Sequence, residues 1–192
     1  MADETDETDE YLRELQQILM EQIGKRGAGG KQAPTSALCW ASHFPKQLIG
    51  ATQKGPFKIK EIPGYDSIID GRSPECIQTT ICNVTQWTGY HAEMITLAAL
   101  LFKHRIIEKL NTAKGDKNPD YSACQTELKN TCGEVYIAAN APCCKHCHNL
   151  LTKLGVKHSP VEGAPGNTGW WNPLNDTVYE NGSPAFQKDL PP

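Results

Sequence analysis

The stretch 134–156, EVYIAANAPCCKHCHNLLTKLGV, decides what kind of fold to expect. Its first eight residues are a compact apolar run that predicts a buried strand, and the residues from 148 onward predict a helix. Pro142 and three cysteines lie at the junction. Cys144 and Cys147 are spaced so that one helical turn points both sulfurs at one place, as ligation of Zn²⁺ requires.

A second candidate helix N-terminus lies upstream. Residues 91–110, HAEMITLAALLFKHRIIEKL, predict a long and mostly buried helix that begins with His91 and Glu93. The unpaired N–H groups and partial positive charge of a helix N-terminus hold electron-rich groups in place. His91 is therefore a candidate third ligand. Three protein ligands leave a fourth position open, which distinguishes catalytic from structural zinc.

The remaining segments predict one further helix and several strands. Residues 6–24 carry apolar side chains at spacings of three and four, which is typical of an amphipathic helix. We expect this helix to pack on the outside of the main domain, and a solvated tail with an oligomerising helix is the alternative. Residues 111–134 are polar and carry turn signals. Strands are expected within 56–62, 75–84, 157–163 and 176–182.

The order of these segments predicts an α/β fold, a three-layer α/β/α sandwich, because strands alternate with helices along the chain. The chain has 192 residues, 39% of them hydrophobic, which suits one globular domain. We expect an acidic helix and a Gly-rich linker over 1–34, followed by a main domain over 35–192 with its zinc core at about 55–185.

Composition also bears on location. No run approaches the roughly 18 apolar residues that span a bilayer, and the acidic N-terminus lacks the layout of a secretory signal. The clustering of the eight cysteines fits a reducing compartment, with some thiols used as ligands. A cytoplasmic location without membrane contact is therefore expected.

The net charge of −3 hides an uneven distribution. Residues 1–10 hold six acids and no base, and without them 16 acidic side chains stand against 19 basic ones. A mildly positive body can bind phosphates without being a strong electrostatic binder. Charge alone does not decide the substrate.

HAE (91–93) and PCCKHC (142–147) together resemble the H-x-E…P-C-x-x-C signature of the zinc-dependent nucleobase deaminases. The resemblance extends to the bacterial toxin-type DNA and RNA cytosine deaminases. It implies a cytidine deaminase-like sandwich with an extra N-terminal helix. It also implies Zn²⁺ as cofactor, held by His91, Cys144 and Cys147, and Glu93 as the catalytic proton carrier.

The sequence departs from this signature by one inserted cysteine, Cys143. Three ligand pairs therefore compete. Cys144 with Cys147 keeps the two-residue gap, Cys143 with His146 keeps the Pro-Cys adjacency, and Cys143 with Cys147 widens the gap. Some toxin-type members of the superfamily lack Pro beside the first ligand, which favours Cys144 with Cys147. Cys143, His146 and His148 would then surround the site.

The implied activity is hydrolytic conversion of cytosine to uracil in a polynucleotide, with single-stranded DNA as the expected substrate and RNA as a further possibility. Tyr90 and Trp87 are the expected walls for the flat base, and Asn83 is a candidate contact to sugar or base. Trp170 and Trp171 are further aromatic candidates, with core packing as the alternative.

Two other functions are open. A metabolic deaminase of free cytidine or related nucleosides and bases would fit the modest charge. A zinc-stabilised interaction module would have no use for Glu93. A toxin domain would be delivered into a target cell and would have an immunity protein as partner. Cys124 and Cys132 could form a second metal site, although a buried thiol is the simpler interpretation of each.

Overall fold

The computed structural model describes residues 4–22, 35–45, 47–52, 75–78, 91–110, 119–160, 170–175 and 177–179. The helices in this part of the chain are α1 (Glu4–Gln22), α2 (Ala92–Lys103), α3 (Ile106–Leu110), α4 (Tyr121–Cys132) and α5 (Lys145–Lys153). The strands are β1 (Ser36–Ala41), β2 (Gln47–Thr52), β3 (Glu75–Gln78), β4 (Val135–Ala139), β5 (Lys157–His158), β6 (Trp170–Asn172) and β7 (Thr177–Tyr179).

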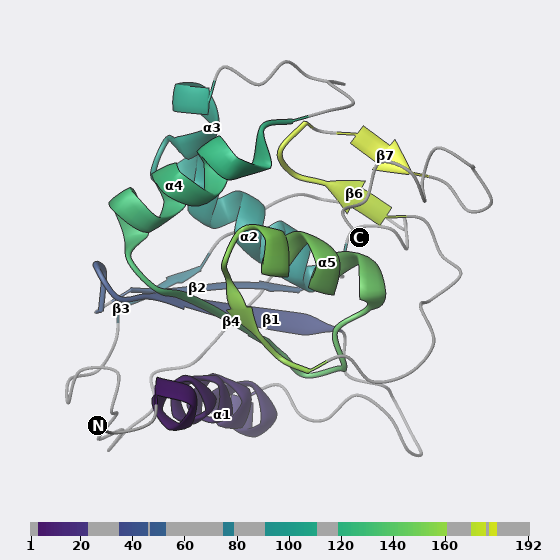
Figure 1. Cartoon of the computed structure of the whole chain (residues 1–192). Helices are drawn as coiled ribbons and strands as arrows, with labels where there is room; N and C mark the ends of the chain where they lie inside the picture. The colour runs from purple at the N-terminus through teal and green to yellow at the C-terminus, as the bar shows by residue number, and fades with distance from the viewer. Residues whose placement is uncertain are drawn as a thin grey trace.

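Five of the strands form one mixed sheet, in the order β3-β2-β1-β4-β5 (Figure 1). β1 pairs antiparallel with β2 and β4, whereas the β2–β3 and β4–β5 pairs are parallel. Every residue of β1 and β4 is buried, because both faces of these central strands are covered. β6 and β7 form a separate antiparallel pair. The predicted mixed α/β class is confirmed.

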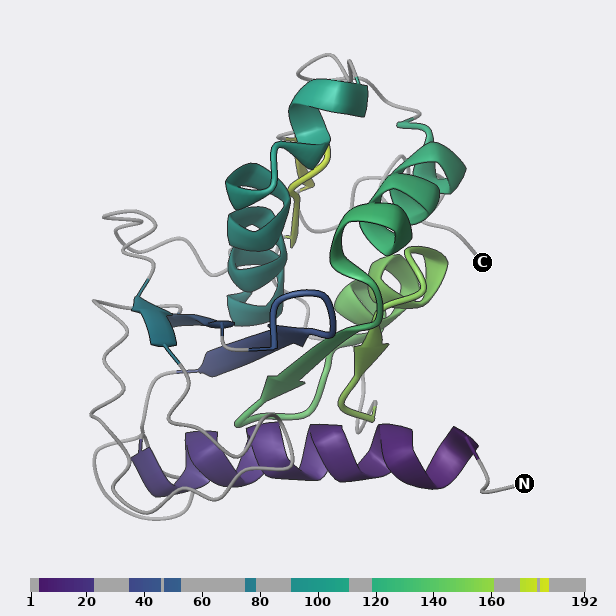
Figure 2. The ribbon, with the colours of Figure 1, turned by 90° about the vertical axis from the view of Figure 1, so that its left-hand side faces the viewer.

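Alternate residues of the central strands point to opposite sides of the sheet, and two apolar cores result. Ala37, Cys39 and Ala41 of β1 join the core beneath α2, α4 and α5, called here the α2/α5 core. The core on the other face, the α1 core, is covered by α1 alone among the described helices (Figure 2). Its buried members are Leu15, Ile18, Leu19, Leu38, Trp40, Leu48, Tyr136 and Ala138.

The single helix predicted over 91–110 is two helices, so that prediction was wrong. Arg105, between α2 and α3, has φ +57°, in the left-handed region through which a right-handed helix does not continue. His104, the residue after α2, stacks on Phe44 with ring centroids 4.1 Å apart. The mostly buried character predicted for this segment is confirmed for α2.

The polar segment 111–134 contains a helix that the turn signals did not predict. Asp120 caps α4, because its Oδ1 accepts a hydrogen bond from the backbone N–H of Ala123 at 2.9 Å. The buried residues of α4 are one turn apart and face the α2/α5 core: Cys124, Leu128 and Cys132.

The strands were predicted in part. β3 lies in the expected range 75–84, β5 in 157–163 and β7 in 176–182, whereas the range 56–62 lies outside the described residues. β1, β2 and β6 were not predicted. β1 and β2 precede residue 55, where the sequence placed the start of the zinc core.

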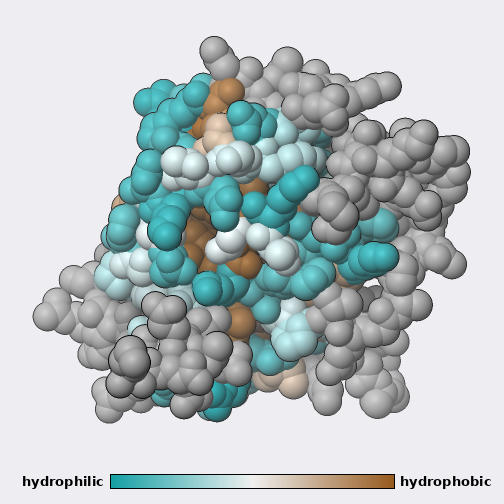
Figure 3. Space-filling model, in the orientation of Figure 1, coloured by the Kyte–Doolittle hydropathy of each residue, from teal (hydrophilic) through white to brown (hydrophobic). Residues whose placement is uncertain are grey.

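The surface of the described part is mostly hydrophilic on the face seen in Figure 3, with small apolar areas between the polar ones. Phe102, at the end of α2, is a large apolar side chain with 74% of its surface exposed. Within the described residues, no helix has both the length and the apolar character needed to cross a membrane.

Candidate metal centre

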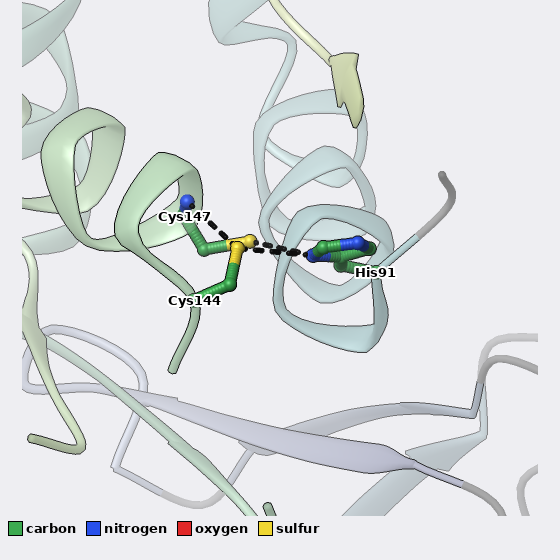
Figure 4. A group of neighbouring side chains, drawn as sticks. All are labelled: His91, Cys144 and Cys147. Atoms are coloured by element: carbon green, nitrogen blue, oxygen red, sulfur yellow. Dashed lines mark hydrogen bonds between the residues drawn. The ribbon is translucent and has the colours of Figure 1, made fainter. Parts of the chain in front are cut away.

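His91 lies at the N-cap of α2, with an extended backbone (φ −71°, ψ 145°). Its carbonyl accepts the first hydrogen bond of the helix, from the N–H of Ile95 at 3.0 Å. Its imidazole does not cap the helix by a side-chain hydrogen bond. The ring instead extends from the helix end toward α5 (Figure 4).

Cys144 occupies the same position on α5. It is the N-cap residue, also extended (φ −75°, ψ 158°), and its sulfur accepts a hydrogen bond from the N–H of Cys147 at 3.4 Å. The first turn of α5 then brings the Cys147 sulfur beside that of Cys144 (Figure 4). Two helix N-termini thus meet at one place, and their partial positive charges favour thiolates there.

The three candidate ligand atoms lie within 4.8 Å of one another. His91 Nδ1 is 3.2 Å from the sulfur of Cys144 and 3.3 Å from that of Cys147. Zinc bonds of ordinary length at a tetrahedral angle would place a nitrogen and a sulfur about 3.6 Å apart. The group therefore fits a metal ion after a shift of a few tenths of an ångström, and its one nitrogen and two sulfurs suit zinc.

The surroundings of the two cysteines shift the pKa values of their thiols in opposite directions. Hydrogen bonds from the Cys147 thiol and from His91 lower the pKa of the Cys144 thiol well below its ordinary value, although burial opposes them. Burial raises the pKa of the Cys147 thiol. A metal ion would bind both sulfurs as thiolates, because the thiolate is the form of cysteine that binds metals.

Glu93 lies in the first turn of α2 with only 4% of its surface exposed. Burial raises the pKa of its carboxyl, and its backbone hydrogen bond and the nearby charge of His91 oppose that shift. Cys144 and Cys147 also interact with this carboxyl through their charges. The structure thus brings a buried acid to the edge of the three-residue group.

Two ties hold the segment between β4 and α5. The end of β4 is joined to the start of β1, since Asn140 N–H donates to Ser36 O at 3.0 Å and Ser36 N–H donates to Asn140 Oδ1 at 2.8 Å. Farther along, Cys143 N–H donates to Pro160 O at 3.3 Å. The position of the cysteines is therefore set by the sheet on one side and by the segment after β5 on the other.

The two histidines beside the cysteines in the sequence, His146 and His148, have partners outside the candidate metal group. His148 Nδ1 lies 2.8 Å from His158 Nε2, and His158 Nδ1 lies 2.8 Å from the carbonyl of Val156. Because that carbonyl can only accept a hydrogen bond, the His158 ring carries its proton on Nδ1. Nε2 of His158 is then an acceptor, and Nδ1–H of His148 donates to it. The His146 ring centroid lies 6.2 Å from that of Trp170.

Among the described residues, the group whose side chains could hold a metal ion consists of His91, Cys144 and Cys147, and Cys143 and His146 are not among its members. Cys124 and Cys132 lie in the α2/α5 core, where burial raises their pKa values to about 12 and about 11, as expected for ordinary buried thiols. Trp170 is fully buried and packs in the same core, and Trp171 is half-buried at its margin.

Three of the predicted substrate contacts, Tyr90, Trp87 and Asn83, lie outside the described residues. Sequence reasoning also left open where the Cys143 side chain lies, and in the structure it is buried, with 1% of its surface exposed.

Fold and site together define a mixed α/β protein with a His-Cys-Cys group that could hold a metal ion, one ligand lying at each of two helix N-caps. Comparison of the chain with protein-family models, with curated proteins and with solved structures found no match.

Proposed function

We propose that the chain is a zinc-dependent hydrolytic deaminase that converts cytosine to uracil. The observation that carries this proposal is the buried Glu93 carboxyl beside the His91, Cys144 and Cys147 group. A purely structural metal site gains nothing from a buried acid, which costs free energy to desolvate. A hydrolytic site needs one, because water must lose a proton and the leaving amine must gain one.

Three protein ligands leave one position of a tetrahedral metal ion for the reaction. When bound there, zinc would supply the Lewis acidity that makes water a nucleophile at neutral pH. His91, Cys144 and Cys147 would hold the ion between the two helix N-termini. One nitrogen and two sulfurs are also the donor set of zinc deaminases.

The role of Glu93 in this proposal is to move protons. Its carboxylate takes a proton from the attacking water, which adds at C4 of the cytosine ring. The same carboxyl then gives a proton to the amino nitrogen, which leaves as ammonia while the oxygen stays on the ring. One water is consumed and one ammonia is released per cytosine. Burial favours the protonated carboxyl and so helps it to keep the proton between these steps.

The proposed fold is the three-layer sandwich of the cytidine deaminase type. Its support is the order of elements: β1, β2, then α2 with His91 and Glu93 at its start, then β4, α5 with the two cysteines, and β5. α1 on one face of the sheet and α2 with α5 on the other supply the two helical layers (Figure 2).

The proposed substrate is cytosine in single-stranded DNA. The chain beyond residue 10 has a small excess of basic side chains, which favours a polyanion. An unpaired base enters a pocket without the few kcal/mol of unstacking that a duplex imposes. Stacking on an aromatic such as Trp87 or Tyr90 would add about 1–3 kcal/mol per base.

The test is to incubate the zinc-loaded protein with a cytosine-containing DNA oligonucleotide, the same sequence in RNA, the DNA duplex and free cytidine. Sequencing reports cytosine-to-uracil conversion in the polymers, and ammonia release reports it for cytidine. We expect the single-stranded DNA to be converted fastest and its binding to weaken steeply with salt. Rapid conversion of cytidine alone would identify a metabolic deaminase, and no conversion of any substrate would contradict the activity.

A further inference from the structure

Phe102, at the end of α2, is the one large apolar side chain that is exposed in the part of the chain that the structure describes, with 74% of its surface accessible. The rest of α2 is mostly buried, since only Ala98, Phe102 and Lys103 among its 12 residues are not. Covering an apolar ring lowers its free energy relative to leaving it in water. A ring that the fold leaves uncovered is therefore available to a ligand.

Phe102 lies on the same side of α2 as His91. Seven residues separate His91 from Ala98 and eleven separate it from Phe102, so helical geometry places all three within about 20° around the axis. The rise of the helix puts Phe102 about 16 Å from His91 along that axis. One face of α2 thus runs from the metal group toward α3 (Figure 1), with half-buried His91 and exposed Phe102 at its two ends. Ile95 is buried between them, so a ligand along this face would touch α2 near its ends.

Basic side chains follow Phe102 directly. Lys103 is exposed and takes part in neither of the ion pairs that α3 forms. Arg105 pairs with Glu108 at 2.9 Å, but both side chains are more than half exposed, so the pair contributes little in water and Arg105 can exchange it for a phosphate. An aromatic ring beside basic side chains is the combination with which proteins bind single-stranded nucleic acids, because a base stacks on the ring while the cations contact phosphates.

We propose that Phe102 stacks on a base of a single-stranded polynucleotide whose reacting cytosine lies at the metal group, and that Lys103 contacts a phosphate beside that base. This inference rests on the proposed function, in which the substrate is a polymer. A stacked strand rises about 3.4 Å per nucleotide, so about 16 Å corresponds to about five stacked nucleotides and to fewer of an extended strand. A duplex keeps its bases stacked on one another and offers Phe102 none without the cost of unstacking.

The first test measures binding without turnover, in zinc-loaded protein that carries Glu93→Gln. The probe is a labelled single strand of about 15 nucleotides with one central cytosine, and its duplex is the comparison. We expect Phe102→Ala to weaken binding of the single strand about 5- to 150-fold and Phe102→Trp to keep it, as for other base-stacking aromatics. Lys103→Gln should lower the slope of log affinity against log salt by about 0.7. Lys157→Gln, at an exposed position of the edge strand β5, is the matched control and should leave the slope unchanged.

The second test asks whether a base, and not only the phosphates, meets Phe102. Abasic nucleotides are introduced one at a time, up to about six positions on either side of the cytosine, which covers the distance along α2. One of them should weaken binding about as much as Phe102→Ala does. In the Phe102→Ala protein the same abasic nucleotide should cost less than about twofold, because the two changes remove one contact and are then not additive.

The outcomes separate this inference from the proposed function. Binding that depends on Phe102, in a protein that deaminates no substrate, would keep the strand-binding surface and reject the deaminase. A deaminase whose Phe102→Ala variant binds the strand as tightly as its parent would reject this inference alone. Equal losses on strand and duplex, or no abasic position whose effect depends on Phe102, would also overturn it. So would a dimer in sedimentation that Phe102→Ala dissociates, since the ring would then belong to a contact between two copies of the chain.

Discussion

The two faces of the central sheet are built from the same strands, but the candidate metal group lies on one of them. The α1 core is an apolar layer with an aromatic group, in which Tyr11 stacks on Trp40 at 4.7 Å between ring centroids. The α2/α5 core is also apolar in its interior, yet His91, Glu93 and Cys144 lie at its edge, where two helices begin. Stability comes from both faces, whereas the candidate chemistry belongs to one.

The largest effect is expected on zinc affinity, when one of the candidate metal ligands is replaced. Cys144→Ser should weaken zinc binding by more than about 100-fold, because even partners outside the ligand set cost 10- to 100-fold. Cys143→Ser should keep zinc. Elemental analysis after dialysis against a fixed free zinc concentration measures both. The reverse result, with zinc retained in Cys144→Ser and lost in Cys143→Ser, would overturn the ligand assignment.

A large effect on activity alone is expected from Glu93. Glu93→Gln should keep zinc and the fold, and should lower deamination by about 10²–10⁴-fold, the usual contribution of a general acid–base group. The assay compares initial rates on the single-stranded oligonucleotide at matched zinc content. A rate within threefold of the wild type would reject the proposed role.

The α1 core should respond in stability and not in metal binding. Leu19 is fully buried there, so Leu19→Ala should lower the free energy of unfolding by about 2–5 kcal/mol. Gln16→Ala, at an exposed position of the same helix, is the matched control and should stay within about 0.5 kcal/mol. Urea unfolding of the zinc-free proteins measures both. A folded Leu19→Ala protein with weakened zinc affinity would show that the two faces are coupled.

The smallest effect is expected at the aromatic group. Tyr11 lies 4.7 Å from Trp40 and 5.1 Å from Tyr136 between ring centroids. Tyr11→Leu keeps an apolar side chain but removes these ring contacts, which should cost about 0.5–1.5 kcal/mol of stability. Thermal unfolding detects a change of that size. No change would mean that area burial alone holds α1 on the sheet.

The sequence predicted the parts of the molecule whose signals are local. The compact apolar run before Pro142 became β4, and the Cys144–Cys147 spacing became the first turn of α5. Both follow from short-range rules of strand burial and helix geometry. The meeting of His91 with these cysteines followed from chemistry, because a tetrahedral metal needs further ligands.

Other parts depended on contacts that no local pattern carries. The turn-forming residues around Asp120 predicted a loop where Asp120 in fact caps α4. The break after α2 could not be predicted, because no glycine or proline lies there. β1 and β2 are short runs that become recognisable as strands only when paired with each other and with β4. The hydrogen bond from Cys143 N–H to Pro160 O joins the start of α5 to the segment after β5, and no local sequence pattern predicts it.

The separation of the ligands along the chain bears on how the protein is made. His91 and Cys144 are 53 residues apart, so the two cysteines are synthesised after His91. The chain must therefore be synthesised past Cys147, and β4 must pair with β1, before the two cysteines can meet His91. Closing such a loop costs entropy that the folded sheet has to supply. Tight metal binding by all three residues thus requires the complete tertiary structure, so metal occupancy can report the folding of newly made chains.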